Sequence, residues 1–426
     1  MVAYVADIIR NFGQYICKKT PDNPGFTRKL LLAGYRAFGL TLRMLPDRRL
    51  TPSRQFSAQY INRTVTRMLS HPEKAALVSV FMPCELLEAM DILPMCAEMY
   101  SAFLCGTWAE SVFAEAAEAE GIAETFCSYH KVLLGSAFTD LLPPPAMVVN
   151  TSLVCDANNL TFRELSRHYD IPQYYVDVPK ERSEESIRYV ADQFRELAAF
   201  LEECTGKKLE AERLRQVMAR SRETINIYRR CMNIRNDRFL PGDVTSELYE
   251  IYLMHNALGT VESQKYASML LNDFQNAVPA KGIRLLWLHT IPHWQEPVAK
   301  LLNFNDRCQI VGCDMCFEGL VDIDPDMPYE SMARRLVMST WNGGRERIDA
   351  AVKAAGELNA DGVICFCHWG CKQTMGLSAM LKTTLEEQGF PTLILNGDGC
   401  DRRNASDGQT ATRLNAFMEM LEREKA

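Results

Sequence analysis

The chain has 426 residues, is 47% hydrophobic and 24% charged, and carries a formal net charge of −7. It is longer than one ordinary domain, so we expect two or three domains with sizeable cores. The charge balance leaves no basic surplus to follow a phosphate backbone, which excludes nucleic acid as an expected partner.

A helical, basic extension is predicted over residues 1–65. Charged and polar residues are spread through Met1–Thr20, which indicates an amphipathic helix and not a signal peptide, because a continuous apolar stretch is missing. Between Lys29 and Arg49, basic residues alternate with Leu and Phe, which favours a solvated extension packed on the main body or on a second subunit. The longest apolar runs, such as Ala75–Pro83, are far shorter than the roughly 20 residues of a membrane span. We therefore expect a cytoplasmic protein without a membrane segment.

Alternating strands and helices are predicted over residues 66–182, the first α/β domain. Short, nearly continuous apolar runs are typical of parallel strands that are covered on both faces. Strands are expected at 75–82, 121–127, 147–154 and 173–178. Helices are expected at 85–90 and 160–168.

A helical connector is predicted over residues 183–275. Ser183 is expected to cap its first helix, with Glu184 and Glu185 near the positive end of the helix dipole. An apolar stripe then recurs at three- and four-residue intervals along this helix, at Ile187, Val190, Phe194, Leu197 and Leu201.

The second α/β domain is predicted over residues 276–426. Strands are expected at 283–288, 309–312, 362–366 and 392–395, and helices at 331–340, 345–357, 375–388 and 410–423. Such alternation predicts parallel sheets with right-handed crossovers. The predicted fold class is therefore α/β, with two domains that each contain a parallel sheet flanked by helices.

Fifteen cysteines are the most unusual feature of the composition. A reducing compartment disfavours structural disulfides, and the odd number argues against a disulfide scaffold. Inert packing is expected for five of them, which fall in helix-like surroundings: Cys17, Cys96, Cys105, Cys204 and Cys231. Six others come at or just after the end of a predicted strand: Cys84, Cys127, Cys155, Cys313, Cys367 and Cys400. Open parallel sheets bind ligands beyond these strand ends, so the six thiols predict an iron–sulfur site in a crevice between the two sheets.

The segment Cys365-Phe-Cys367-His-Trp-Gly-Cys371 places three thiols within seven residues. If the strand persists, Cys365 and Cys367 share one of its faces. Gly370 permits a sharp turn, so Cys371 is expected to begin the next helix, where the dipole favours the metal-binding thiolate. Segment 126–130 places hydroxyl and imidazole groups beside a thiol, and the small and amide residues of 155–159 can hydrogen-bond a sulfur cluster and tune its potential. The glycine-rich turn 396–403 follows a strand and can approach a cluster or a phosphate closely.

Other chemistries compete with an iron–sulfur cluster. Structural zinc needs two close ligand pairs, and Cys313-x-x-Cys316 is the one CxxC in the sequence. A nucleophilic pair, Cys367 with His368 or Cys127 with His130, would leave most of the thiols at strand ends unexplained.

Acid–base candidates are fewer than thiol candidates. His289 and His293 follow a predicted strand, although both also fit as structural polar residues near the cleft. His368 lies in the cysteine-rich segment. Glu85 and Glu296 lie near strand or turn ends and are weaker candidates.

Five motifs are specific when taken together. They are Phe126-Cys-Ser-Tyr-His130, Ser152-Leu-Val-Cys155-Asp, Asp361-Gly-Val-Ile, His368-Trp-Gly-Cys371-Lys, and Gly397-Asp-Gly-Cys-Asp-Arg-Arg continuing into Thr412-Arg413. From about residue 70 to the C-terminus they resemble the 2-hydroxyacyl-CoA dehydratase / benzoyl-CoA reductase family. The Cys-His-Trp-Gly-Cys version is most similar to the double-cubane cluster proteins of that family.

This resemblance implies two α/β domains, of the Rossmann or flavodoxin-like kind, on either side of a cleft that holds the cluster. It implies Cys127, Cys155 and Cys371 as the ligands of one [4Fe–4S] cubane. A double-cubane [8Fe–9S]-type cluster needs further cysteines, for which Cys84, Cys313, Cys367 and Cys400 compete, with the last three slightly favoured. The implied partners are a second copy in a homodimer and an activator protein that hydrolyses ATP and supplies low-potential electrons. The sequence has no Walker motif, so ATP hydrolysis is expected elsewhere.

Three functions are open at this point. The favoured prediction is an oxygen-sensitive oxidoreductase of anaerobic metabolism, with a double-cubane cluster, that reduces small molecules after charging by the activator. The second is a 2-hydroxyacyl-CoA dehydratase subunit, a lyase that has a single [4Fe–4S] cluster and pairs with a different subunit. The third is a non-catalytic iron–sulfur carrier.

Overall fold

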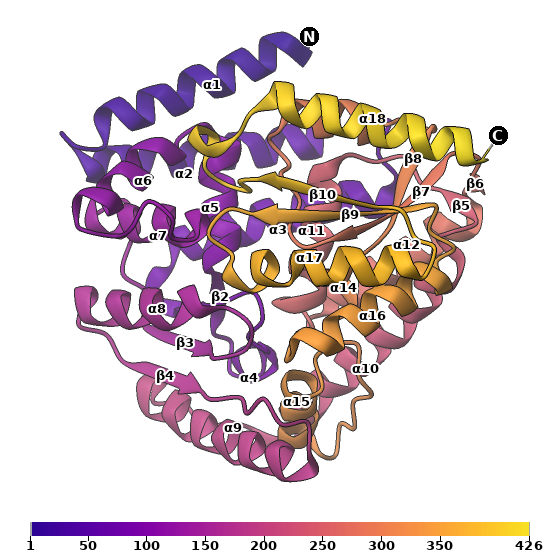
Figure 1. Ribbon diagram of the computed structural model, residues 1–426. Helices are drawn as coiled ribbons and strands as arrows, with labels where there is room; N and C mark the ends of the chain where they lie inside the picture. The colour runs from indigo at the N-terminus through magenta and orange to yellow at the C-terminus, as the bar shows by residue number, and fades with distance from the viewer. Residues whose placement is uncertain (1, 426) are drawn as a thin grey trace.

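Two four-stranded parallel sheets organise the structure (Figure 1). The computed structural model describes residues 2–425, with side chains from residue 7 onward. The first sheet has the order β2-β1-β3-β4, with β1 (Ala75–Val78), β2 (Leu93–Cys96), β3 (Met147–Thr151) and β4 (Gln173–Val176). The second has the order β10-β9-β7-β8, with β7 (Ile283–Leu288), β8 (Cys308–Cys313), β9 (Gly362–His368) and β10 (Thr392–Gly397). The predicted α/β class is confirmed.

Burial explains why the central strands consist mostly of apolar residues. Every residue of β1, β3 and β9 is buried. Such strands bury both faces under helices, so apolar residues follow one another along them without polar alternation, and polar residues come only at the ends, as Asn150 and Thr151 in β3 and His368 in β9. A two-residue antiparallel ribbon, β5 (Arg238–Phe239) with β6 (Val278–Pro279), lies outside both sheets.

One strand prediction was wrong. Residues 121–127 form a turn between α6 (Glu110–Ala119) and α7 (Ser128–Phe138), and Gly121 has a φ of 90°. The fourth strand of the first sheet is instead β2, whose sequence Leu-Pro-Met-Cys gives a weak strand signal. A proline is tolerated there because β2 is an edge strand.

The remaining helices fall into four groups. The N-terminal extension contains α1 (Val2–Lys19), α2 (Pro24–Met44) and α3 (Pro52–Ser70). The first sheet is accompanied by α4 (Glu85–Ala89), α5 (Ala97–Gly106), α8 (Asp156–Tyr169) and α9 (Glu184–Thr205). The middle of the chain forms α10 (Ala211–Ile234), α11 (Val244–His255) and α12 (Val261–Asn276). The second sheet is accompanied by α13 (Glu296–Leu302), α14 (Asp314–Phe317), α15 (Pro328–Val337), α16 (Gly344–Glu357), α17 (Lys372–Glu387) and α18 (Asp407–Lys425).

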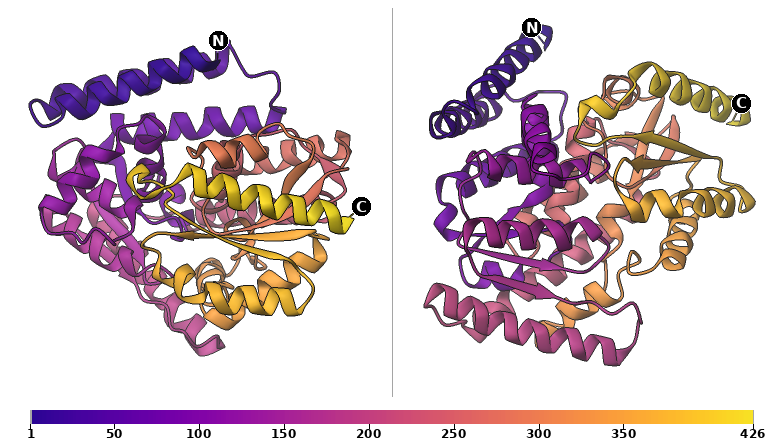
Figure 2. Two further views of the ribbon diagram at one scale, coloured as in Figure 1. Left: turned by 45° about the horizontal axis from the view of Figure 1, so that its top comes forward. Right: turned by 60° about the vertical axis from the view of Figure 1, so that its left-hand side comes forward.

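The helical predictions hold in detail where the apolar pattern was clearest. The Ser183 side chain accepts a hydrogen bond from the backbone N–H of Ser186 and caps α9 as predicted. The predicted apolar stripe of α9 is buried along its whole length. Figure 2 shows α1 as an outer layer, apart from both sheets. No helix in the described part of the chain is long and apolar enough to cross a membrane.

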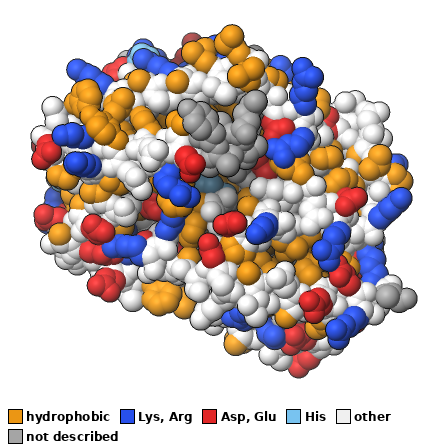
Figure 3. All heavy atoms as spheres, turned by 90° about the horizontal axis from the view of Figure 1, so that it is seen from above, with side chains coloured by type: hydrophobic (Ala, Val, Ile, Leu, Met, Phe, Trp, Pro, Cys, Tyr) orange, Lys and Arg blue, Asp and Glu red, His pale blue; other side chains and the backbone are white. Residues whose placement is uncertain are grey.

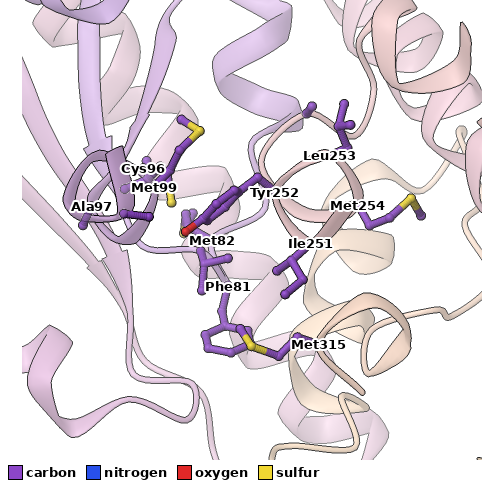
Figure 4. Packing of buried hydrophobic residues seen from close by; sticks show 14 of the residues in the cluster. Phe81, Met82, Cys96, Ala97, Met99, Ile251, Tyr252, Leu253, Met254 and Met315 are labelled. Carbon is purple, nitrogen blue, oxygen red and sulfur yellow. The ribbon is translucent and has the colours of Figure 1, made fainter. Parts of the chain in front are cut away.

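One hydrophobic core joins the two sheet units. Figure 4 shows Phe81, which follows β1, beside Met315 of α14, with Ile251 and Tyr252 of α11 close by. The ring centroids of Phe81 and Trp341, which come from different units, lie 5.4 Å apart. The junction between the sheets is therefore packed, and a cavity there has fixed walls. On the outer face seen in Figure 3, acidic and basic side chains are interspersed with hydrophobic ones.

A buried ion pair also crosses this junction. The carboxylate of Glu85 on α4 accepts a hydrogen bond from Arg335 Nη1 on α15 at 2.6 Å. Ser221 Oγ on α10 lies 3.1 Å from the same carboxylate oxygen. Glu85 was a weak acid–base candidate. Its contacts with α10 and α15 indicate a structural role, in which it holds α4 to these two helices.

The substitution Glu85→Gln is expected to lower the free energy of unfolding by about 3–5 kcal/mol, because it leaves the Arg335 guanidinium buried without a charged partner. Urea denaturation followed by circular dichroism measures this loss. Glu296→Gln is the matched control, since Glu296 is exposed and lies 3.6 Å from its neighbour Lys300 on the same helix. Its effect should stay within about 0.5 kcal/mol. Equal stability of the two variants would contradict a structural role for Glu85.

Candidate functional site

A cavity of about 290 Å³ lies between the two sheet units. Three thiols line it, from Cys127, Cys155 and Cys371, although they are separated by up to 244 positions in the chain. Aromatic and aliphatic side chains from α11 and from both sheet units form most of the remaining wall. The structure thus brings together the three residues that the resemblance implied as ligands of one cubane.

Each of the three thiols stands at the N-terminus of a helix. Cys127 is the N-cap of α7, Cys155 of α8 and Cys371 of α17. The N-termini of three helices therefore meet at the cavity. Burial raises the pKa of the Cys127 and Cys155 thiols, and the positive ends of the helix dipoles act in the opposite direction. The prediction that Cys127 follows a strand was wrong, because it follows the turn after α6. The helix start predicted at Cys371 is confirmed.

Gly370 allows the segments that carry Cys127 and Cys371 to meet. It has a φ of 85°, in the left-handed region. A Cβ atom at this position would lie 2.7 Å from the backbone nitrogen of Cys127. A side chain would therefore push the turn after β9 away from the start of α7, and would separate two of the three thiols.

Two buried histidines contact the sulfur atoms. The Nε2 atom of His368 lies 3.3 Å from Cys127 Sγ, and the backbone N–H of Gly399 donates to His368 Nδ1 at 3.0 Å. Since Nδ1 accepts, the neutral ring carries its proton on Nε2 and directs it at the sulfur. The Nε2 atom of His130 lies 3.7 Å from Cys155 Sγ. Burial lowers the pKa of His368 and lowers the pKa of His130 to about 3, so both rings are neutral near pH 7.

His289, another predicted acid–base candidate, also lines the cavity. Its ring stacks on Trp341 and on His368, with centroids 5.7 and 6.0 Å apart. Its φ of 81° is a strained conformation for a residue with a side chain. The Asp314 carboxylate holds this conformation, because it accepts the His289 backbone N–H at 2.6 Å and is itself paired with Arg347. Burial lowers the pKa of His289 well below its usual value.

Glu98 is a cavity residue that the sequence analysis did not identify. It lies in the first turn of α5, two residues after the end of β2, and its carboxylate accepts the backbone N–H of Val80 at 3.0 Å. Its other oxygen lies 3.8 Å from His130 Nε2. The pKa of Glu98 is raised to about 7, mainly because the carboxyl is buried. A carboxyl with that pKa exchanges protons near neutral pH, as a general acid or base requires.

The other predicted ligands do not line this cavity. The Cys313 thiol donates to the carbonyl of His289 and lies beside Cys316. The Cys400 thiol donates to the carbonyl of Ser101 and lies beside Cys105.

Cys367 and Cys84 are also outside the cavity. Strand β9 continues through His368, so Cys367 points to the opposite face, where it packs with Cys365 and Leu381 in a separate hydrophobic cluster. The shared face predicted for Cys365 and Cys367 is confirmed. The Cys84 sulfur accepts from Asn256 Nδ2 at 3.6 Å. The four candidates for a second cubane thus lie at separate places in the structure.

Two acid–base candidates also lie elsewhere. His293 lines a second cavity beneath the N-terminal helices, and Glu296 is exposed at the start of α13. Within residues 2–425, no group of three or more His, Cys, Asp or Glu side chains is arranged to hold a single metal ion.

Comparison with known proteins identifies the family. Residues 79–421 match the family described as 2-hydroxyglutaryl-CoA dehydratase, D-component. The chain belongs to this family. The resemblance stated from the motifs is confirmed at that level, whereas the double-cubane subgroup is not shown.

Curated relatives are similar at low identity. The chain is 24% identical over 370 residues to the (R)-phenyllactyl-CoA dehydratase alpha subunit of Clostridium sporogenes, which covers 82% of this chain and 90% of the relative. It is 23% identical over 374 residues to the (R)-2-hydroxyisocaproyl-CoA dehydratase alpha subunit of Clostridioides difficile, with the same coverage. It is 21% identical over 309 residues to (R)-2-hydroxyglutaryl-CoA dehydratase, subunit alpha, of Acidaminococcus fermentans, which covers 66% of this chain and 61% of the relative.

Proposed function

We infer that this chain is the cluster-bearing subunit of a 2-hydroxyacyl-CoA dehydratase, a lyase that removes water from a 2-hydroxyacyl thioester. The observation that carries this proposal is the meeting of three thiols, each at the N-terminus of a helix, in one apolar cavity beside a carboxyl whose pKa is raised to about 7. The dehydratase names of the relatives agree with it. This second of the three predicted functions is better supported than the double-cubane reductase.

The donor set of the cavity fits a single [4Fe–4S] cluster. Thiolates are the usual ligands of such clusters, and three of them leave one iron without a protein ligand. The candidates for a second cubane lie outside this cavity, so its lining supplies thiols for one cubane only. When bound, the cluster would supply an electron at low potential and an open iron site for a substrate oxygen.

The side chains around the thiols have separate roles in this proposal. Cys127, Cys155 and Cys371 would hold the cluster. The His368 N–H points at the sulfur of Cys127 and would tune the potential of a bound cluster. Glu98 takes up or releases the proton that dehydration moves. Phe81 and Trp341 exclude water from the cavity.

The partners also follow from the dehydratase proposal. The relatives are alpha subunits, so we expect this chain to pair with a different subunit in place of the predicted homodimer. An activator protein that hydrolyses ATP would deliver the electron, as the family resemblance implies.

Iron counting and an activity assay test this function. Protein purified anaerobically is expected to contain about four irons and four sulfides per chain, as a [4Fe–4S] cluster requires. With activator, partner subunit, ATP and reductant, it should convert a 2-hydroxyacyl-CoA into the enoyl-CoA. About eight irons per chain would contradict the single cubane and favour the reductase. Four irons without turnover on a panel of 2-hydroxyacyl-CoA esters would favour the carrier.

A further inference from the structure

A second cavity, of about 500 Å³, lies between the N-terminal helices and the body of the protein. Helices α1 and α2 form one wall, with Phe12 and Phe38 among the residues that face the cavity. The opposite wall comes from α5, the loop after it and α11. The family match begins at residue 79, so α1 and α2 lie outside the matched part of the chain.

The N-terminal helices are seated closely enough to act as a fixed wall. A Cβ atom on Gly13 of α1 would lie 1.8 Å from the carbonyl oxygen of Thr107, so the backbones of α1 and of the loop after α5 are in direct contact. A Cβ atom on Gly34 of α2 would lie 2.7 Å from the ring of Phe12. Tyr35 and Leu31 of α2 are buried against the body.

Aromatic rings dominate the lining of this cavity. They include Phe12, Tyr35, Phe103, Trp108, Tyr249 and Trp294. Cavities of this kind take apolar groups with a flat or branched body.

The basic side chains of the lining are Arg402, which is ion-paired, and His293, which is uncharged. The Arg402 guanidinium lies 3.9 Å from the ring centroid of Trp108 and 4.9 Å from that of Trp294, and it pairs with Glu110 at 2.6 Å. Burial lowers the pKa of His293 to about 4, so that ring is neutral near pH 7. The lining therefore suits an uncharged group and not the phosphates of coenzyme A.

Two residues form a wall shared by this cavity and the thiol cavity. Leu248 and Tyr252 line both cavities, and both are buried. They lie four positions apart on α11 and so occupy the same face of that helix. A molecule whose reacting carbon is in the thiol cavity therefore has an apolar space on the far side of these two side chains.

We propose that the second cavity binds the apolar side chain of the acyl group, with a preference for an aromatic ring, and that the N-terminal helices set this preference. The proposal rests on the proposed dehydratase function, because that function supplies the thioester. It assigns a selectivity role to a part of the chain that the family match does not cover.

Two thioesters that lack the 2-hydroxyl group, and so do not react, test the preference. Isothermal titration of the anaerobically purified protein with 3-phenylpropanoyl-CoA and propanoyl-CoA is expected to show at least about tenfold tighter binding of the first, the gain expected from burying one phenyl ring. Ala37→Phe, which adds a ring to the cavity wall, should reduce this preference to less than about twofold. Phe38→Ala, which removes a lining ring, should weaken binding of the phenyl thioester several-fold. Leu40→Phe is the control, because Leu40 is exposed on α2, as Ala37 and Phe38 are, but does not line the cavity.

A probe without coenzyme A separates this proposal from the proposed function. Saturable binding of 3-phenylpropanol, followed by the fluorescence of Trp108 and Trp294, is expected in the wild type and in Leu40→Phe, and should be lost in Ala37→Phe. Absence of that binding, or its persistence in Ala37→Phe, would overturn the ring-binding cavity. Equal affinity of the two thioesters would overturn the acyl assignment and leave the dehydratase function intact. Binding of the alcohol with neither thioester bound would contradict the dehydratase function.

Discussion

Cys371→Ala is expected to lower the iron content from about four per chain to less than one, and to remove the visible absorbance of the cluster. A cubane held by three thiolates loses a direct ligand when this side chain is truncated. Dehydratase activity should fall by more than about 100-fold, because even changes to partners of metal ligands cost 10–100-fold. Anaerobic iron and sulfide analysis with absorption spectra measures the first effect, and an enoyl-CoA assay measures the second.

Cys367→Ala is the matched control for Cys371→Ala. Cys367 is four residues away and buried, but it packs on the opposite face of β9 with Leu381 and Leu385. The iron content of this variant should equal that of the wild type. Loss of half or more of the iron in Cys367→Ala would contradict the single-cubane assignment. Retention of all iron in Cys371→Ala would show that the three cavity thiols are not the ligands.

Glu98→Gln is expected to lower kcat by about 100- to 10,000-fold with the iron content unchanged, which is the usual cost of losing a general acid or base. Glutamine keeps the shape of the side chain, and its carbonyl oxygen still accepts the Val80 N–H, but it no longer carries a transferable proton. Steady-state kinetics of the complete system, together with iron analysis, check both expectations.

The control for Glu98→Gln is Asp156→Asn, a carboxylate that also lines the thiol cavity but is exposed. This control should change kcat less than about threefold, because the charge of an exposed carboxylate is screened by water and interacts only weakly with the reacting groups. A kcat for Glu98→Gln within threefold of the wild type would exclude Glu98 as the proton-transfer group. A parallel loss of iron would instead assign it to the integrity of the site.

The sequence alone determined the fold class and most of the strands, and its resemblance to the family implied the three thiols of the cavity. Strand periodicity is local information, so β1, β3 and the strands of the second sheet could be predicted from apolar runs. The turn at Gly370 and the helix start at Cys371 were predicted for the same reason, because a glycine and the following helical pattern lie within a few residues of each other. Parallel topology then implies that residues beyond the strand ends meet, as Cys155 and Cys371 do.

The tertiary structure alone decided which of the other residues reach the cavity. Strand β9 extends two residues beyond the predicted end at 366, and the alternation of side chains turns Cys367 away and His368 inward. Strand β2 contains Pro94 and escaped prediction, so Glu98, which follows it, could not be assigned to the site. The second cavity arises because α1 and α2 pack on α5 and α11, which are distant in the chain. Such contacts depend on side-chain packing between segments far apart in sequence, and local periodicity carries no information about that packing.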